Sequence, residues 1–284
     1  MKCKSIQPTM YFRLQLLLAM ALLCSLSLHA MEPDTTRLIT RATSYGAGTA
    51  NIFDTYLSPV NYHGVDFRFT RENTRLTRWG DGKFTAQTFF QGDVSYVHNR
   101  ADNNKTLYML ANWNYGVHYN MNLLHNLKLQ LGGVGDLNGG FVYNMRNGNN
   151  PAQARAYINV DASAAIRWDV KIHHKPVHLR YQLNVPLAGV MFMPHYDESY
   201  YEIFSIGNGG GVVNFTSLHN APSLRQIVSA DFPLSRLYLR LSYVWDAQQA
   251  HVNGVKTHAY QHVFLVGFVK HLYAAKRFQK GGKK

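Results

Sequence analysis

Long segments of this chain alternate between apolar and polar residues with a period of two. From Leu107 to Tyr119 every second residue is apolar, and the residues between them include asparagine, glycine and histidine. The same pattern recurs from Ile158 to Val170, from Val177 to Leu187 and from Leu237 to Trp245. Successive side chains of a β-strand point to opposite faces, so each segment predicts a strand with one apolar and one polar face.

The predicted strands are longer than those of soluble sheets. They run for about 10 to 14 residues, whereas soluble strands have about 5 to 6 and a tilted strand crosses a bilayer in about 9 to 11. Aromatic residues end several apolar stripes, as at Tyr119, Trp168 and Trp245, which is expected at membrane interfaces. These features predict an all-β, transmembrane antiparallel up-and-down β-barrel. A secreted soluble β-protein, with its polar stripes facing water, is the weaker alternative.

The first 30 residues predict a secretory signal peptide. Three basic residues precede the apolar run Leu14–Leu28, and this run of about 15 residues is shorter than the roughly 20 of a membrane-spanning helix. Ala30 is the expected last residue before cleavage. The barrel is then expected over 31–272, with a basic C-terminal tail over 273–284.

Cleavage of this leader changes the chemistry of the mature chain. Cys3 and Cys24 both lie in the leader, so the mature chain has no thiol for a disulfide, a metal or a nucleophile. The formal charge is +13, and removing the three leader bases leaves +10.

The basic residues are spread along the chain, which argues with the leader against nucleic acid as a partner. We expect outer-membrane lipid and lipopolysaccharide instead, because their phosphates attract positive charge. The expected location is the outer membrane of a Gram-negative bacterium, reached with the barrel-assembly machinery. The oligomeric state is left open.

Twelve strands is the expected count, with ten as the fallback. The candidate strands lie near residues 36–46, 64–73, 84–98, 106–120, 126–143, 154–170, 176–193, 199–207, 211–218, 223–232, 236–247 and 258–270. The first strand has a poor pattern, and the region 199–218 is interrupted by three consecutive glycines and reads as one irregular strand or two.

The predicted connections alternate in length. Short ones fall at 122–126, 173–176 and 233–235, and longer polar ones at 99–105, 145–153, 193–199 and 246–257. Short periplasmic turns and longer outside loops are typical of outer-membrane barrels. The segment from Gly46 to Tyr62 predicts a further ordered outside loop.

Four segments carry a family resemblance. They are residues 146–154 (RNGNNPAQA), residues 194–204 (PHYDESYYEIF), residues 45–59 and the tripeptide Asp231-Phe232-Pro233. Together they resemble an uncharacterised Bacteroidales outer-membrane family known only as a domain of unknown function. The resemblance implies an outer-membrane barrel and carries no activity with it.

One short motif bears on a lipid hydrolase. Outer-membrane phospholipases place a His and a Ser two residues apart on one strand face, where the imidazole can take the hydroxyl proton. This chain contains no His-x-Ser, but it has the reverse order in Ser217 and His219, beside Asn220. Ser217 and His219 are therefore the catalytic candidates, against the ordinary interpretation of polar residues at a strand end.

A denser polar cluster is predicted in an outside loop. Its ligand-binding candidates are His195, Tyr196, Asp197, Glu198, Tyr200 and Tyr201. The carboxylates would suit a cation and the aromatic rings a sugar or lipid. Adjacent carboxylates diverge on an extended segment and converge on calcium only in a turn. A solvated loop with interfacial tyrosines is the ordinary alternative.

Charged residues in the polar stripes are expected to line the barrel interior. They are Asp66, Arg68, Asp93, Lys128, Asp161, Arg167, Asp169, His178, Arg180, Arg236 and Arg240. One interpretation is an ion-pair network that fills the interior, and the other is a narrow, porin-like passage with a mild preference for anions. About twelve strands lie between the packed barrels of eight and the channels of sixteen.

The chain is thus expected to have a binding, structural or narrow-passage role and no enzymatic one. The alternative is a lipid-modifying hydrolase of the phospholipase or lipid A deacylase type. The sequence predicts no cofactor and no metal site.

Overall fold

Eleven antiparallel strands make up most of the structure. The computed structural model describes residues 38–273, apart from 149, 173–174, 208 and 235–236. The strands are β1 (Leu38–Asp54), β2 (Ser58–Leu76), β3 (Phe84–Asn99), β4 (Lys105–Leu124), β5 (Leu127–Asn144), β6 (Ala152–Ile172), β7 (Lys175–Phe192), β8 (Val213–Ser217), β9 (Leu224–Leu234), β10 (Leu237–Val252) and β11 (Val255–Tyr273). The predicted signal peptide and basic tail lie outside the described residues.

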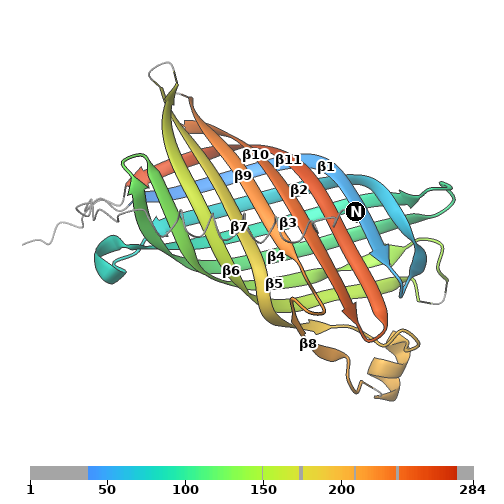
Figure 1. Ribbon diagram of the computed structural model, residues 1–284. Helices are drawn as coiled ribbons and strands as arrows, with labels where there is room; N and C mark the ends of the chain where they lie inside the picture. Colours follow the sequence, from blue (N-terminus) through green and yellow to red (C-terminus); the bar gives the residue numbers. More distant parts are fainter. Residues whose placement is uncertain (1–37, 149, 173–174, 208, 235–236, 274–284) are drawn as a thin grey trace, which may run out of the picture.

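Ten of these strands close into a barrel (Figure 1). Each strand pairs with its neighbours in sequence, and β1 pairs with β11 from Leu38 opposite Tyr273 to Asp54 opposite Thr257. Strand β8 is the exception, because it pairs only with β7 and lies outside the closed ring. The predicted antiparallel barrel is confirmed, and its ten strands with one outside strand fit the expected range of ten to twelve.

The two ends of the barrel differ. We call the end with connections 55–57, 100–104, 145–151, 193–212 and 253–254 the loop end. The other, the terminus end, holds the start of β1, the end of β11, the two-residue turn 125–126 and the connection 77–83 with the short helix η1 (Trp79–Gly82).

Two strand pairs extend further toward the loop end than predicted. Strands β1 and β2 continue to a three-residue turn at 55–57, so the expected outside loop from Gly46 to Tyr62 is wrong. Strands β10 and β11 replace the expected loop at 246–257. Their turn consists of Asn253 and Gly254, with φ of 52° and 75°, and Asn-Gly with two positive φ values is a strong hairpin signal.

The predicted strand at 199–207 is instead a short helix, η2 (Glu202–Ile206). Ser199 Oγ accepts a hydrogen bond from the Glu202 amide at 3.3 Å, and the Glu202 carboxylate accepts one from the Ser199 amide at 2.7 Å. This reciprocal capping box starts a helix. The Ser-x-x-Glu spacing therefore accounts for a helix where a strand was expected.

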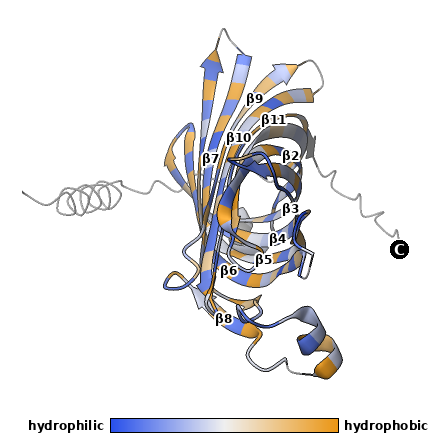
Figure 2. Ribbon diagram, turned by 90° about the vertical axis from the view of Figure 1, so that its right-hand side faces the viewer, coloured by the Kyte–Doolittle hydropathy of each residue, from blue (hydrophilic) through white to orange (hydrophobic). Residues whose placement is uncertain are grey.

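The exterior of the barrel carries the apolar stripes. Tyr45, Phe67, Trp113, Ile158 and Phe264 point outward and are between 47% and 70% exposed. Figure 2 shows the alternation of hydrophobic and hydrophilic residues along the strands. A soluble protein would bury such residues, so the soluble alternative does not fit. None of the helices among the described residues is long and apolar enough to cross a membrane.

An apolar cluster packs inside the lumen at the loop end. We call it the apolar cap, and its buried members include Ile52, Tyr56, Leu57, Tyr62, Val97, Tyr108, Leu110, Val142, Tyr157, Met193, Ala221, Ala250, Val252, Val255 and Ala259. Most are inward-facing strand residues near the loop end, and Tyr56 and Leu57 come from the turn 55–57. Burial of these apolar side chains stabilises the packing at the loop end.

The barrel wall is irregular where β8 meets β9. Both strands pair with one edge of β7, Ser217 opposite Ala188 and Arg225 opposite Asn184, so residues 218–223 loop out. This loop bonds back to β8: the Asn220 and Ala221 amides donate to Ser217 O, and the Asn220 side chain donates to Phe215 O.

The same loop also covers part of β10. Strand β10 pairs with β9 only as far as Ala247 opposite Leu224. Beyond that point Ser223 Oγ donates to Gln249 O at 3.3 Å and accepts from Gln249 N at 3.1 Å, and His251 N donates to Asn220 O at 2.7 Å. We call this contact between residues 218–223 and 248–252 the seam.

Candidate ligand-binding cavity

Ion pairs fill the terminus half of the lumen. Arg240 donates to both oxygens of Asp231, at 2.6 and 2.8 Å, and to Glu72 at 2.6 Å. Arg180 bonds to the other oxygen of Glu72 and to Gln182 at 2.7 Å. A cavity of about 420 Å³ in this half of the lumen is lined by Glu72, Arg180 and Arg240. Most of these charged groups are buried, so each needs its ion-pair or hydrogen-bond partners to offset the loss of hydration.

A second network crosses the middle of the lumen. Asp246 Oδ2 accepts from Arg225 Nε at 3.0 Å, from Gln91 Nε2 at 3.1 Å and from Arg68 Nη1 at 3.4 Å. Arg68 also lies 3.3 Å from Asp66, and Asp66 and Gln91 are fully buried. We call this group the central network. It joins β2, β3, β9 and β10 across the barrel.

Asp136 is held by amides rather than by a cation. Its Oδ1 accepts from Asn112 at 2.5 Å and Asn114 at 3.3 Å, and its Oδ2 accepts from Asn138 at 2.6 Å. Asn112 in turn accepts from Arg225 at 2.8 Å. These bonds link the three asparagines to the central network. Among the described residues, Asp136 itself makes no ion pair with an arginine or lysine.

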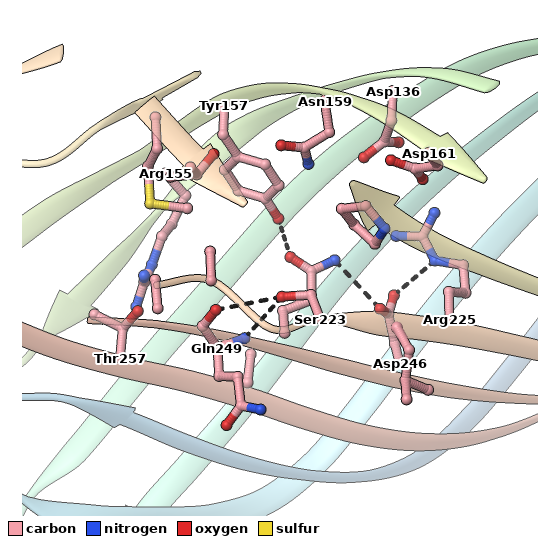
Figure 3. A pocket seen from close by; sticks show the side chains of 18 of the residues that line it. Asp136, Arg155, Tyr157, Asn159, Asp161, Ser223, Arg225, Asp246, Gln249 and Thr257 are labelled. Atoms are coloured by element: carbon pink, nitrogen blue, oxygen red, sulfur yellow. Dashed lines mark hydrogen bonds and ion pairs between the residues drawn. The ribbon is translucent and has the colours of Figure 1, made fainter. Parts of the chain in front are cut away.

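A cavity of about 730 Å³, its open mouth included, lies between the apolar cap and the central network. Tyr108 and Tyr157 of the cap line one part of it, and Arg225 and Asp246 of the central network line another. Figure 3 shows that Asp136, Asn159 and Asp161 also surround it. We call it the loop-side cavity.

The seam forms one wall of the loop-side cavity. Thr216, Ser223 and Leu224 line it from the β8–β9 side, and Gln249 and Ala250 line it from β10. Figure 3 shows the bonds of Ser223 to Gln249 at this wall. The cavity thus lies where the wall is joined by side-chain bonds rather than by a continuous backbone ladder.

The structure assembles the predicted lumen charges into two buried groups and a cluster of three residues near the terminus end. Asp66, Arg68, Asp93 and Asp161 are buried around the centre, and Arg180 and Arg240 lie in the terminus half. Arg167, Asp169 and His178 form a partly exposed cluster near the terminus end, with Arg167 Nε 3.1 Å from Asp169. Lys128 is half-buried on β5, and Arg236 lies outside the described residues.

The predicted loop cluster folds into a turn. Glu198 N donates to His195 O at 3.1 Å, and the Glu198 carboxylate turns back to His195 N at 3.4 Å. Asp197 is exposed on the other side of the turn, as is Tyr196. The two carboxylates therefore do not converge, and the described residues contain no group of three His, Cys, Asp or Glu placed to hold a metal.

Two tyrosines of the loops pack against each other at the cap. The Tyr200 ring contacts Tyr56 edge-on at 6.0 Å, and its hydroxyl accepts from the Ala154 amide at 2.6 Å. The Tyr56 hydroxyl donates to Glu198 O at 2.8 Å. Burial raises the pKa of Tyr56 to about 12, helped by nearby Tyr200 and acidic groups. Tyr201, in contrast, is exposed.

The structure brings Ser217 and His219 together. Ser217 Oγ lies 2.5 Å from His219 Nδ1, and Ser217 also lines the loop-side cavity. Asn220 does not orient the imidazole, because its side chain bonds to Phe215 O and Ser217 N instead. The pair therefore lacks the third group of a catalytic triad among these neighbours.

Several residues of the cavity were not singled out by sequence reasoning. Asp136, Arg225, Tyr108 and Tyr157 occupy inward stripe positions, so alternation alone could have found them. Asp246 lies where the expected strand 236–247 meets the expected loop 246–257, and the Asn253-Gly254 turn signal further along the chain indicates that the strand continues past it. The pairing partners depend on the register around the whole barrel, which no local pattern contains.

A family model described as a protein of unknown function, DUF3316, matches residues 14–279. The chain belongs to this family. This matches the resemblance to a domain of unknown function noted from the sequence. No curated protein sequence matches the DUF3316 chain.

Solved structures with a similar fold are outer-membrane β-barrels. The transport unit of the autotransporter AIDA-I from Escherichia coli matches with a TM-score of 0.43 and 10% identity, over 91% of this chain and 97% of that one. The translocator domain of autotransporter NalP from Neisseria meningitidis matches with a TM-score of 0.39 and 10% identity, over 92% and 96%. The COG4313 outer membrane channel from Pseudomonas putida F1 matches with a TM-score of 0.34 and 10% identity, over 87% and 98%. At these values the similarities concern the type of fold, and we draw no functional argument from them.

Proposed function

We propose that this DUF3316 protein is a closed outer-membrane barrel that binds a small ligand in its loop-side cavity. The observation that supports this is the central network, which separates the loop-side cavity from the cavity of the terminus half. Asp246, Arg68 and Arg225 span the lumen there, and Gln91 and Asp66 are fully buried beside them. A ligand in the loop-side cavity has no open path through the barrel.

In this proposal the loop end faces outward and the leader is removed during export from a Bacteroidales cell. The exposed apolar exterior contacts lipid, and the basic residues contact lipid and lipopolysaccharide phosphates. The longer connections 145–151 and 193–212 at the loop end support this orientation, because outer-membrane barrels have short periplasmic turns and longer outside loops.

Conductance in a planar lipid bilayer tests the closed lumen. We expect the purified full-length protein to give no steady unit steps. The variant Arg225→Ala with Asp246→Ala removes both members of one ion pair from the central network, and we expect it to introduce such steps. Steady unit conductance of the unmodified protein would show a narrow passage and overturn the proposed binding role.

A second candidate function is lipid hydrolysis at Ser217. The observation that favours it is the 2.5 Å contact between Ser217 Oγ and His219 Nδ1, since a hydroxyl bonded to an imidazole is the arrangement of an activated nucleophile. An exposed turn with a local side-chain bond explains the same contact.

Labelling with a fluorophosphonate probe distinguishes the two explanations of the Ser217 contact. A hydrolase would be labelled, and Ser217→Ala would abolish the label while Ser205→Ala, at an exposed serine of η2, would keep it. We expect no labelling, because Asn220 is bonded elsewhere and leaves the imidazole unoriented.

A further inference from the structure

Asp161 is a buried carboxylate that aims into the loop-side cavity without a partner. Its side chain is on β6, lines the cavity and is only 4% exposed. Its Oδ1 accepts no hydrogen bond, and no described cation lies within ion-pair distance of it. The residues opposite it on the neighbouring strands are Val134 and Pro186, and neither side chain has a donor.

The other carboxylates around the cavity are already occupied. Asp246 is bonded to Arg225 and Arg68, and Asp136 is held by asparagine amides. Arg225 makes its ion pair with Asp246 and none with Asp161. A buried carboxylate with no partner is strongly unfavourable, which makes Asp161 the group in this cavity that a ligand would complete.

The charge balance of the lumen also favours a cationic ligand. Its buried acidic side chains among the described residues are Asp54, Asp66, Glu72, Asp93, Asp136, Asp161, Asp231 and Asp246. Its buried arginines are Arg68, Arg155, Arg225 and Arg240, with Arg180 slightly more exposed. Acidic groups outnumber the arginines, although the whole chain has a net charge of +13. This excess of buried acidic groups favours a cation as the ligand, whereas a mild preference for anions was one of the two interpretations of the sequence.

The lining around Asp161 favours an organic cation over a metal ion. Among the described residues, no three His, Cys, Asp or Glu side chains lie close enough together to hold one metal ion. Calcium takes about six to eight oxygen ligands. One part of the cavity wall, on β7, is apolar and consists of Pro186, Ala188 and Met191. Thr216 adds a buried hydroxyl with no hydrogen-bond partner.

We infer that the loop-side cavity binds a primary ammonium group carried on a short apolar chain, with Asp161 as the receiving carboxylate. This inference rests on the proposed binding function and names the class of ligand. The ammonium donates hydrogen bonds to Asp161, and the apolar chain packs on the side of β7.

Titration calorimetry of the full-length protein in detergent tests this inference, with n-hexylammonium as the probe. We expect saturable binding of n-hexylammonium and at least ~tenfold weaker binding of 1-hexanol and hexanoate, because a hydrogen bond between charged groups is worth about that factor or more. Calcium chloride should give no saturable heat that depends on Asp161.

Two variants and one control test whether n-hexylammonium binds at Asp161. Asp161→Asn should weaken n-hexylammonium binding at least ~tenfold, whereas Asp102→Asn, which removes an exposed carboxylate in the turn 100–104, should leave it unchanged. Val134→Lys places an ammonium group opposite Asp161 and should block the probe. Gel mobility before and after boiling checks that each variant is folded.

Two results would overturn the inference: equal affinity of Asp161→Asn and the unmodified protein, or equal affinity for 1-hexanol and n-hexylammonium. In the second case the cavity still binds a ligand, so the proposed function survives without the ammonium preference. Steady unit conductance of the unmodified protein is the separate result that removes the proposed function itself.

Discussion

Arg240 is the side chain on which the terminus half of the lumen depends most. It makes three hydrogen bonds to Asp231 and Glu72. Arg240→Met leaves these two carboxylates with fewer partners, and breaking a buried ion pair costs about 3 to 5 kcal/mol. We expect a loss of this size in the free energy of unfolding, measured by urea titration in detergent.

The matched control is Arg167→Met, at the partly exposed rim. Arg167 pairs with Asp169, whose side chain is 36% exposed, and such pairs contribute about 0 to 1 kcal/mol. Adding Asp231→Leu to Arg240→Met should recover part of the lost stability. A loss no larger than that of the control would contradict the buried-network explanation.

Glu202 makes the helix η2 sensitive to acid. Hydrogen bonds from the Ser199 amide and hydroxyl hold the pKa of Glu202 below its ordinary value of 4.5. A carboxyl whose pKa is lowered on folding stabilises the folded state above its ordinary pKa, and this stabilisation is lost as the pH falls through the folded pKa. We expect faster amide exchange at Ser199 in acid than the change of intrinsic rate explains.

The control for this effect is Glu202→Gln, which keeps a hydrogen-bond acceptor at the cap but cannot titrate. Its Ser199 amide should follow the intrinsic rate at every pH. An equal acid effect in both proteins would show that another group is responsible.

At the scale of residues, the sequence predicts which face a side chain is on but not its partner. Alternation puts Arg68 on the inward face of β2, where the structure has it. Its partner Asp246 is 178 residues away in the chain. That contact depends on the closure and register of the whole barrel, and these are properties of ten paired strands rather than of one segment.

The seam is the place where strand pairing is weakest. Ser223 bonds to the amide and carbonyl of Gln249 in place of a neighbouring strand. Ser223→Ala removes both bonds, so we expect amide exchange at Gln249 to be about fivefold faster, which corresponds to a hydrogen bond worth ~1 kcal/mol.

Ser205→Ala, at an exposed serine of η2, is the control for the seam. Exchange at Gln249 should be unchanged in this variant. If Ser223→Ala also left exchange unchanged, the seam would be held by the contact of His251 with Asn220 rather than by the serine.

At the scale of elements, alternation predicted the strands that face lipid on one side and the lumen on the other. The prediction from alternation was wrong where a local capping or turn motif determines the backbone more strongly than the period-two pattern. The capping box at Ser199 and Glu202 produces a helix where a strand was expected, and the Asn253-Gly254 turn produces a tight hairpin where a loop was expected. Both signals are visible in the sequence, and both act through backbone geometry rather than hydrophobic pattern.

The whole molecule should behave as a closed β-barrel on a gel. Its ten-strand ring is closed by the pairing of β1 with β11, and closed barrels satisfy their backbone groups internally. We expect detergent-solubilised protein to migrate faster unheated than boiled. Unchanged mobility, together with solubility in the absence of detergent, would contradict a membrane barrel.

Outside the closed ring, the short strand β8 has an edge that does not pair with β7, and such an edge can pair with a strand from another copy. The C-terminal part of that edge is occupied, because the loop that follows bonds back to the carbonyl groups of Phe215 and Ser217. An edge that is already used cannot serve as a template for intermolecular sheet formation. Even at high density in a crowded membrane, a strand from another copy therefore finds these two carbonyl groups of β8 already bonded.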